Sequence, residues 1–176
     1  MNPSYYELGD HTEVVNIHYN PDMVCFEKLL SVFWKNHNPS IPNQRQYRSL
    51  ILYHNDKQNI LAQESLTLAR QKSPDEVQTE ILPTEVYYNA EDYHQKYILQ
   101  QHPWLVTALQ IQTGEELVKS HVCTRLNGYL SGYGERENFL KEAKGLGLND
   151  KMIEYVKTEI RSRQLLMANS IEKHVA

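Results

Sequence analysis

Apolar and polar residues alternate along residues 12–19, the first regular pattern in the chain. Val15, Ile17 and Tyr19 fall on one face of this stretch, and polar residues take part of the other. A period of two is typical of a half-buried strand. The pattern therefore predicts a strand over 12–19, closed by Asn20-Pro21.

The period then changes to that of a helix and back again. Phe26, Leu29 and Phe33 recur at helical spacing and predict a helix over 25–36. The short apolar run in 46–54 predicts a buried strand. The same criteria predict three further features, which are a second helix over 55–72, its cap at Asn55-Asp56, and a short strand over 77–82.

Residues 90–101 are predicted to form a helix that ends before Pro103. On such a helix Ala90, Tyr93, His94 and Tyr97 share one face, because their spacings are three and four. We expect that face to point inward and the neighbouring charges to stay outside. The pattern leaves two interpretations open. The helix is either a core element whose histidine is hydrogen-bonded, or one wall of a site that places His94 near Glu13.

From Pro103 onward every pattern is helical, and glycines punctuate it. The predicted fold class is therefore α+β, a mixed sheet with packed helices followed by a helical extension. We expect two domains, 1–102 and 103–176.

Composition limits the function without assigning it. Apolar residues make up 40% of the 176 and charged residues 23%, with a net charge of −4, as in ordinary globular proteins. We therefore expect neither a nucleic-acid nor a membrane partner. The isolated cysteines Cys25 and Cys123 favour a reducing, cytoplasmic setting, and no sequence motif for a metal ion or cofactor is present.

Candidate chemistry gathers where predicted strands begin. Glu13 follows Asp10 and His11 at the start of the first strand, and Tyr47 and Arg48 stand at the start of the second. A partly desolvated glutamate beside tyrosine hydroxyls can keep a proton and donate it. The alternative is a solvated Glu13 with Arg48 as its surface partner, because charged side chains are mostly exposed.

The order and spacing of these segments over residues 2–97 resemble the type A peptide-methionine sulfoxide reductase family. The matching runs are NPSYYELGDHTEVV, FEKLLSVFWKNHNP, QYRSLILYH, TEIL and YYNAEDYHQKY. Residues 98–176 are similar, though less closely, to the helical C-terminal extension of some insect-type members.

This resemblance implies a ferredoxin-like reductase core that reduces the S-epimer of methionine sulfoxide, free or in proteins. By motif position, Glu13 is the proton donor, and Tyr5 and Tyr47 hold the sulfoxide oxygen. The supporting residues that it implies on the 90–97 segment are Glu91, Asp92 and His94. The family uses a cysteine thiolate, which a second thiol or thioredoxin restores, and needs no cofactor.

The sequence departs from the family where the nucleophile is expected. Gly-Cys-Phe-Trp occurs nowhere in the 176 residues, so no nucleophile is assigned and we expect an N-terminally truncated core with exposed sheet edges. Cys25 is interpreted as a buried, inert thiol, and Cys123 as at most a resolving one. The run Ile41-Pro42-Asn43 stands where the family carries Gly-Asn-Asp, so the assisting aspartate is also replaced.

Three hypotheses follow. In the first, the chain is a methionine-S-sulfoxide reductase by family, although these residues alone supply no assigned nucleophile. In the second, it is a noncatalytic module that binds oxidised methionine or a protein. In the third, it is an interaction module that uses its C-terminal helices.

Overall fold

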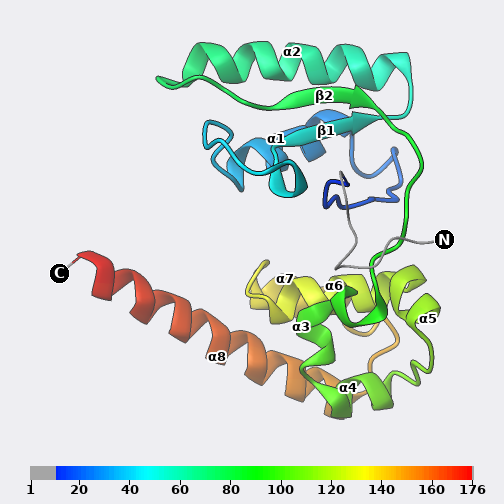
Figure 1. Cartoon of the computed structure of the whole chain (residues 1–176). Helices are drawn as coiled ribbons and strands as arrows, with labels where there is room; N and C mark the ends of the chain where they lie inside the picture. Colours follow the sequence, from blue (N-terminus) through cyan, green and yellow to red (C-terminus); the bar gives the residue numbers. More distant parts are fainter. Residues whose placement is uncertain (1–10, 176) are drawn as a thin grey trace. The chain divides into compact units, whose positions relative to one another are not determined.

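The computed structural model describes the chain from residue 11 to residue 175, with side chains described as far as residue 166. The chain forms two compact units, residues 1–89 and 90–176 (Figure 1). The domain boundary predicted between residues 102 and 103 separates a family core from its extension. The division into compact units does not test it, so it stays a prediction.

The first unit is built on a β-α-β crossover. Strand β1 (Leu50–Tyr53) pairs in parallel with β2 (Glu80–Pro83), from Leu50 opposite Glu80 to Tyr53 opposite Pro83. Parallel neighbours need a long connection, which α2 (Asp56–Lys72) supplies. Figure 1 shows α2 running alongside the strand pair. A short 3-10 helix, η2 (Arg45–Tyr47), precedes β1.

The core of the first unit is small. Helix α1 (Phe26–Lys35) packs against α2 and the sheet through Leu30, which is buried together with Ile51 and Ala62. Around them lie partly buried apolar residues, which are Phe26, Phe33, Trp34, Leu61 and Ile81. So few fully buried side chains leave the unit dependent on its buried hydrogen bonds as well as on apolar burial.

Three elements of this unit confirm the sequence patterns. Helix α1 falls within the predicted 25–36, and α2 falls within 55–72. Asn55 caps α2 as predicted, because its Oδ1 accepts a hydrogen bond of 3.0 Å from the backbone N–H of Gln58. The strands predicted in 46–54 and 77–82 are present but short. The α+β class is confirmed.

The strand predicted over 12–19 is wrong. These residues have no regular secondary structure, and the side chains of Val15 and Ile17 are 85% and 54% exposed. A strand needs a neighbour for its backbone groups. The described sheet holds only β1 and β2, which are parallel, so the mixed sheet is not seen in residues 11–175.

Two buried hydroxyl groups, just before β1 and β2, are hydrogen-bonded to each other and to His37, which follows α1. His37 Nδ1 lies 2.8 Å from the carbonyl oxygen of Phe33, an acceptor, so Nδ1 carries the proton and Nε2 accepts. Ser49 Oγ therefore donates to His37 Nε2 at 2.7 Å. Thr79 Oγ1 lies 2.8 Å from Ser49 Oγ and donates in turn. Ser49 and Thr79 are both buried, so each hydroxyl depends on this chain for a partner.

The second unit consists of short helices around one apolar core. Its elements after residue 90 are η3 (Asp92–His94), α3 (Tyr97–Gln100), α4 (Pro103–Ala108), α5 (Gly114–Lys119), α6 (His121–Leu130), α7 (Arg136–Glu142) and α8 (Asp150–Val175). Leu99, Leu105, Leu126 and Phe139 are fully buried and bring four of these helices together. Helix α8 joins them through Met152, Val156 and Ile160, the i, i+4 spacing of one helix face. Within residues 11–175, no helix has both the length and the apolar character that crossing a bilayer requires.

An ion pair with a tyrosine links α6 to α7. Arg125 donates to Glu142 Oε1 at 2.6 Å from Nη2 and 3.1 Å from Nε, and its Nη2 lies 3.2 Å from the Tyr129 hydroxyl. Burial alone would raise the pKa of Glu142. The hydrogen bonds from Tyr129 and Arg125, together with the charge of Arg125, outweigh burial and lower that pKa.

We expect Ser49→Ala to destabilise the first unit by about 1–3 kcal/mol, because it leaves His37 Nε2 and the Thr79 hydroxyl without their partner. Urea unfolding of both proteins measures the change. Ser65→Ala is the control, since that hydroxyl donates to the carbonyl oxygen of Ala62 within its own helix at 2.7 Å. Equal effects of the two substitutions would contradict a structural role for the hydroxyl chain.

We expect Glu142→Gln to flatten the loss of stability with acid. A carboxyl whose pKa is lowered on folding stabilises above its unfolded value of 4.5, and that contribution disappears as pH falls through the folded value. Urea midpoints of the wild type and the variant, measured across about pH 6 to 3, should therefore converge as the pH falls. A constant difference across this range would refute the expectation.

Candidate functional site

Residues 12 and 13 are held against the turn that precedes β1. The backbone N–H of Glu13 donates to the carbonyl oxygen of Gln46 at 2.9 Å. The side-chain amide of Gln46 donates to Glu13 Oε1 at 2.8 Å. The Thr12 hydroxyl donates to the carbonyl oxygen of Arg45 at 3.0 Å. Two segments more than thirty residues apart in sequence are thus joined side by side, and the Glu13 carboxylate is given a fixed neighbour.

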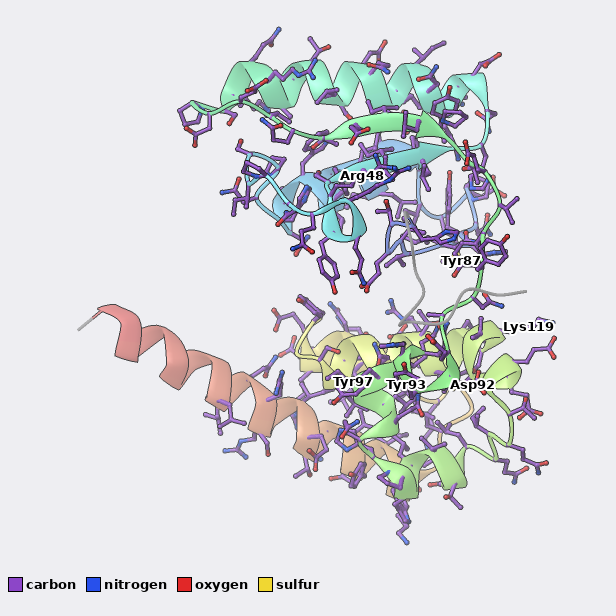
Figure 2. All side chains as sticks on the ribbon, viewed as in Figure 1. Arg48, Tyr87, Asp92, Tyr93, Tyr97 and Lys119 are labelled. Carbon is purple, nitrogen blue, oxygen red and sulfur yellow. The ribbon has the colours of Figure 1, made fainter. Side chains whose placement is uncertain are left out.

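Arg48 bridges this junction to the sheet. Its Nε donates to Thr12 Oγ1 at 3.1 Å, and its Nη1 donates to both carboxylate oxygens of Glu80 at 3.0 and 3.1 Å. Figure 2 labels Arg48 in the first unit. The alternative that Arg48 is the surface partner of Glu13 is therefore wrong, because its carboxylate partner is Glu80 of β2.

The predicted oxygen-holding tyrosines are only partly described. Tyr47 ends η2, directly after Gln46, and its side chain is 50% exposed. Tyr5 lies outside the described residues. Glu13 itself is exposed, so the partial desolvation expected for it is not found among the described residues. Residue 12 is followed by an irregular stretch rather than a strand, and what fixes Glu13 is hydrogen bonding rather than burial.

A ring contact adds a third neighbour to this region. His11 meets the ring of Tyr88 edge-on, with centroids 5.6 Å apart. The segment 11–13 therefore contacts both the turn before β1 and the chain that follows β2. These contacts place the His11 imidazole against the Tyr88 ring, and the Glu13 carboxylate against Gln46, the residue before Tyr47.

The helix predicted over 90–101 is wrong. Residues 92–94 form η3 and residues 97–100 form α3, with Lys96 between them in the left-handed region at φ 47°. The side-chain amide of Gln100 donates to the carbonyl oxygens of Asp92 and Gln95 at 2.7 and 2.6 Å. A side chain thus takes the carbonyl groups that a continuous helix would have used, and the break is stabilised.

The break also changes which side chains face solvent. Tyr93 and Tyr97 are 55% and 57% exposed, so the predicted inward aromatic face does not exist. His94 Nε2 lies 3.8 Å from Glu91 Oε2, and the rings of Tyr93 and His94 are 4.1 Å apart. Glu91 and His94 are therefore neighbours, as supporting residues would be. The predicted proximity of His94 to Glu13 joins residues of different units and stays a prediction.

Asp92 is packed against a glycine of the helical extension. A β-carbon on Gly114 would lie 1.9 Å from Asp92 Oδ1 and 2.0 Å from its Cγ, which no pair of atoms tolerates. Figure 2 labels Asp92 together with Tyr93 and Tyr97. Gly114 is the first residue of α5, so the absence of a side chain there lets the Asp92 carboxylate lie directly against the start of that helix.

The two cysteines differ from each other and partly from expectation. Cys25 is exposed at the N-cap of α1, so its interpretation as a buried thiol is wrong. Cys25 is exposed because it precedes the first turn of α1, and the apolar contacts of that helix begin only with Phe26. Cys123 is fully buried in α6 within the apolar core of the second unit. Both thiols are free, and no described group of three or more His, Cys, Asp or Glu side chains is arranged to hold a metal ion.

Thr12 and Glu80 are the residues that sequence reasoning missed. Glu80 carried no signal, because the parallel register that places it opposite Leu50, close to Arg48, is seen only in the structure. Thr12 carried no signal of its own. Its role depends on a contact with residue 48 that no local pattern reports.

Comparison with known proteins gives two family matches. The family model described as "Peptide methionine sulfoxide reductase" matches residues 1–126. A second, described as "Selenoprotein methionine sulfoxide reductase A, helical domain", matches residues 113–161. The first match includes Glu13, Tyr47 and the 90–97 segment, and the second includes α6 and α7.

Individual relatives carry the same name. A peptide methionine sulfoxide reductase of Drosophila melanogaster is 44% identical over 156 residues, which are 87% of this chain and 63% of that protein. Peptide methionine sulfoxide reductase A2 of Arabidopsis thaliana is 41% identical over 56% of this chain and 50% of its own length. MsrA of Sulfolobus acidocaldarius is 39% identical over 54% of this chain and 60% of its own. The chain thus spans less than two thirds of each of these relatives.

We expect Gly114→Ala to destabilise the second unit by about 1 kcal/mol, because the added methyl group displaces the Asp92 carboxylate. Thermal unfolding measures the loss. Gly128→Ala is the matched control, since nothing lies within 4 Å of a β-carbon there and alanine favours the helix. In an Asp92→Ala background the cost of Gly114→Ala should fall to near zero, and an unchanged cost would contradict the proposed clash.

Proposed function

This chain belongs to the peptide methionine sulfoxide reductase family, and from that membership we propose that it acts in the thiol-dependent reduction of methionine-S-sulfoxide, free or within proteins. Glu13 donates the proton to the sulfoxide oxygen, and the hydroxyls of Tyr5 and Tyr47 hold that oxygen. Glu91, Asp92 and His94 support the site. The observation that carries the proposal is the junction of residues 12–13 with the 45–48 turn.

The geometry of that junction suits a proton donor. Gln46 donates to one carboxyl oxygen of Glu13 at 2.8 Å, which leaves the other oxygen, Oε2, for the substrate. Tyr47, which is half-exposed, follows Gln46 directly in the chain. A sulfoxide oxygen carries partial negative charge, and a phenol and a protonated carboxyl group are both donors to it.

The first step consumes one thiol per sulfoxide, and the complete reaction consumes two. The thiolate attacks the sulfoxide sulfur to form an S–S bond. The oxygen, protonated by Glu13, then moves to the thiol sulfur as the S–O bond and the S–S bond both break, which leaves methionine and a sulfenic acid. Methionine sulfur gains two electrons, and the thiol sulfur loses them. A second thiol then condenses with the sulfenic acid to form a disulfide and water, and a dithiol such as thioredoxin reduces the disulfide.

We assign the attacking thiol to neither described cysteine. Cys123 is fully buried in the core of the second unit, which bars it from a substrate in the folded state. Cys25 is exposed, but it stands apart from a Gly-Cys-Phe-Trp motif, which the 176 residues do not contain. That sequence observation favours a second candidate function, in which these residues bind oxidised methionine without reducing it. A cytoplasmic location and thioredoxin as the reductant complete the proposal and rest on the resemblance and on the cysteine content.

We expect N-acetyl-methionine-S-sulfoxide methylamide to shift the NMR resonances of residues 13 and 46–47, and the R epimer and the sulfide to shift them much less. Tyr47→Phe should weaken binding about fivefold, the value of one ordinary hydrogen bond. Tyr133→Phe is the control, since Tyr133 is 69% exposed in the other unit. Binding that ignores the epimer, or no binding at all, would refute the sulfoxide site.

We expect these 176 residues by themselves, supplied with dithiothreitol, to turn over no methionine-S-sulfoxide above the rate without protein, because they contain no cysteine that we assign as the attacking thiol. Chromatographic measurement of methionine released checks this, with Cys25→Ser in parallel. Turnover that disappears in Cys25→Ser would overturn our interpretation of Cys25 and make it the nucleophile. Binding without turnover would support the second candidate for these residues.

A further inference from the structure

Arg48 makes two kinds of contact from one guanidinium group. Its Nη1 is shared between the carboxylate oxygens of Glu80 at 3.0 and 3.1 Å, while its Nε points to Thr12 Oγ1 at 3.1 Å. The Arg48 side chain is only 23% exposed, so its bonds are partly shielded from water. A planar fork can serve two partners in different directions, which a lysine ammonium on a flexible stem does poorly.

The backbone at the Glu80 end of this bridge is held in the sheet, while the Glu80 side chain is 47% exposed. Glu80 begins β2 opposite Leu50, and its backbone N–H donates to the carbonyl oxygen of Ser49 at 3.1 Å. Ser49 in turn is held by the buried hydroxyl chain to His37. The guanidinium group is therefore anchored on the sheet, which fixes the position from which Nε reaches Thr12.

The Thr12 end has a defined direction. The Thr12 hydroxyl has one proton, which it donates to the carbonyl oxygen of Arg45 at 3.0 Å, so it accepts from Arg48 with a lone pair. Both functions of one hydroxyl are thus used to hold residue 12 between the turn and the guanidinium group. The next residue is Glu13, whose N–H and carboxylate bond to Gln46.

Among the described residues, little else is available to orient Glu13. The side chains from Glu13 to His18 are exposed, and the backbone there has no regular structure. Ordering such a residue costs conformational entropy in the backbone, which the bonds at residues 12 and 13 have to offset. A proton donor is useful only when its carboxyl group is already in place, so these bonds bear on catalysis as well as on folding.

We propose that Arg48 is a positioning residue that, anchored on Glu80, holds Thr12 and thereby keeps the Glu13 carboxyl group against Gln46, where the proposed reduction needs it. The inference rests on the proposed function for its purpose, and on the hydrogen-bond geometry of Arg48 and Thr12 for its mechanism. Arg48 itself need not touch the substrate.

Amide hydrogen exchange and the side-chain amide resonance of Gln46 test this proposal on the whole chain. In Arg48→Gln we expect the Glu13 amide to exchange about tenfold faster, while amides of α2 change less than about twofold. The Gln46 side-chain resonance should move to the position that it takes in Glu13→Gln, because the carboxylate has left it. Arg48→Lys should not restore it.

Matched variants separate positioning from general stability. Thr12→Val should reproduce both changes, because it removes only the hydroxyl, and Thr12→Ser should behave as the wild type. Arg70→Gln is the charge control, since Arg70 is exposed near the end of α2. Should Arg48→Gln fail to fold, Arg48→Lys decides the question in its place, because it keeps the charge and loses the fork, whereas Thr12→Val also removes the bond to the carbonyl oxygen of Arg45.

Two results would overturn the proposal. The first is wild-type exchange at Glu13 with an unmoved Gln46 resonance in both Arg48→Gln and Thr12→Val. The second is equal acceleration at Glu13 and in α2, since Arg48 would then serve the fold in general. Titration with N-acetyl-methionine-S-sulfoxide methylamide is the separate arm. If the wild type does not bind it, the proposed function fails, while the exchange data still decide whether Arg48 positions Glu13.

Discussion

The hydrogen bonds between residues 12–13 and the 45–48 turn are the interaction on which the candidate site depends. They join segments more than thirty residues apart and give the exposed Glu13 a defined place beside Gln46. Apolar burial does not supply this order, because the stretch after residue 12 lies open to solvent. A carboxyl group held in this way is oriented by donors and acceptors, so the site is sensitive to single hydroxyl and guanidinium groups.

The first unit has a small apolar core, so its buried hydroxyl groups, those of Ser49 and Thr79, matter for its stability. Leu30, Ile51 and Ala62 form its buried cluster among the described residues, so apolar area is limited. The chain from Thr79 through Ser49 to His37 adds directional bonds inside the unit, where a missing partner is costly. Ser49 follows Tyr47 and Arg48 and directly precedes β1, so packing and site geometry share one short stretch of sequence.

The second unit is organised differently, by apolar packing of short helices. Its core contains thirteen buried residues from nearly every helix, and its ion pair of Arg125 and Glu142 lies between α6 and α7. The 90–97 segment belongs to this unit, and Asp92 fits against Gly114. Residues of the family's AEDYHQ motif are thus packed with the helical extension, which gives that extension a structural part in holding a motif segment.

The sequence by itself determined the elements whose hydrogen bonds are local. Helices α1 and α2 and the Asn55 cap follow from spacing and from a side chain three residues away from its partner. The order of the motifs also identified the family, while the roles that it implies for Glu13 and Tyr47 stay predictions. These features depend on neighbours along the chain, so a linear pattern records them.

Only the tertiary structure decided the elements whose partners are distant. Alternation over 12–19 predicted a strand, but a strand exists only where another backbone lies beside it, and there the described partner is the 45–48 turn. Residues 90–101 had a helical period, yet the Gln100 amide captures two carbonyl groups and Asp92 fits onto Gly114. The pairing of Arg48 with Glu80 and Thr12 has the same origin. The partners of a polar side chain lie on distant chain segments, and the sequence pattern does not show which segments come together.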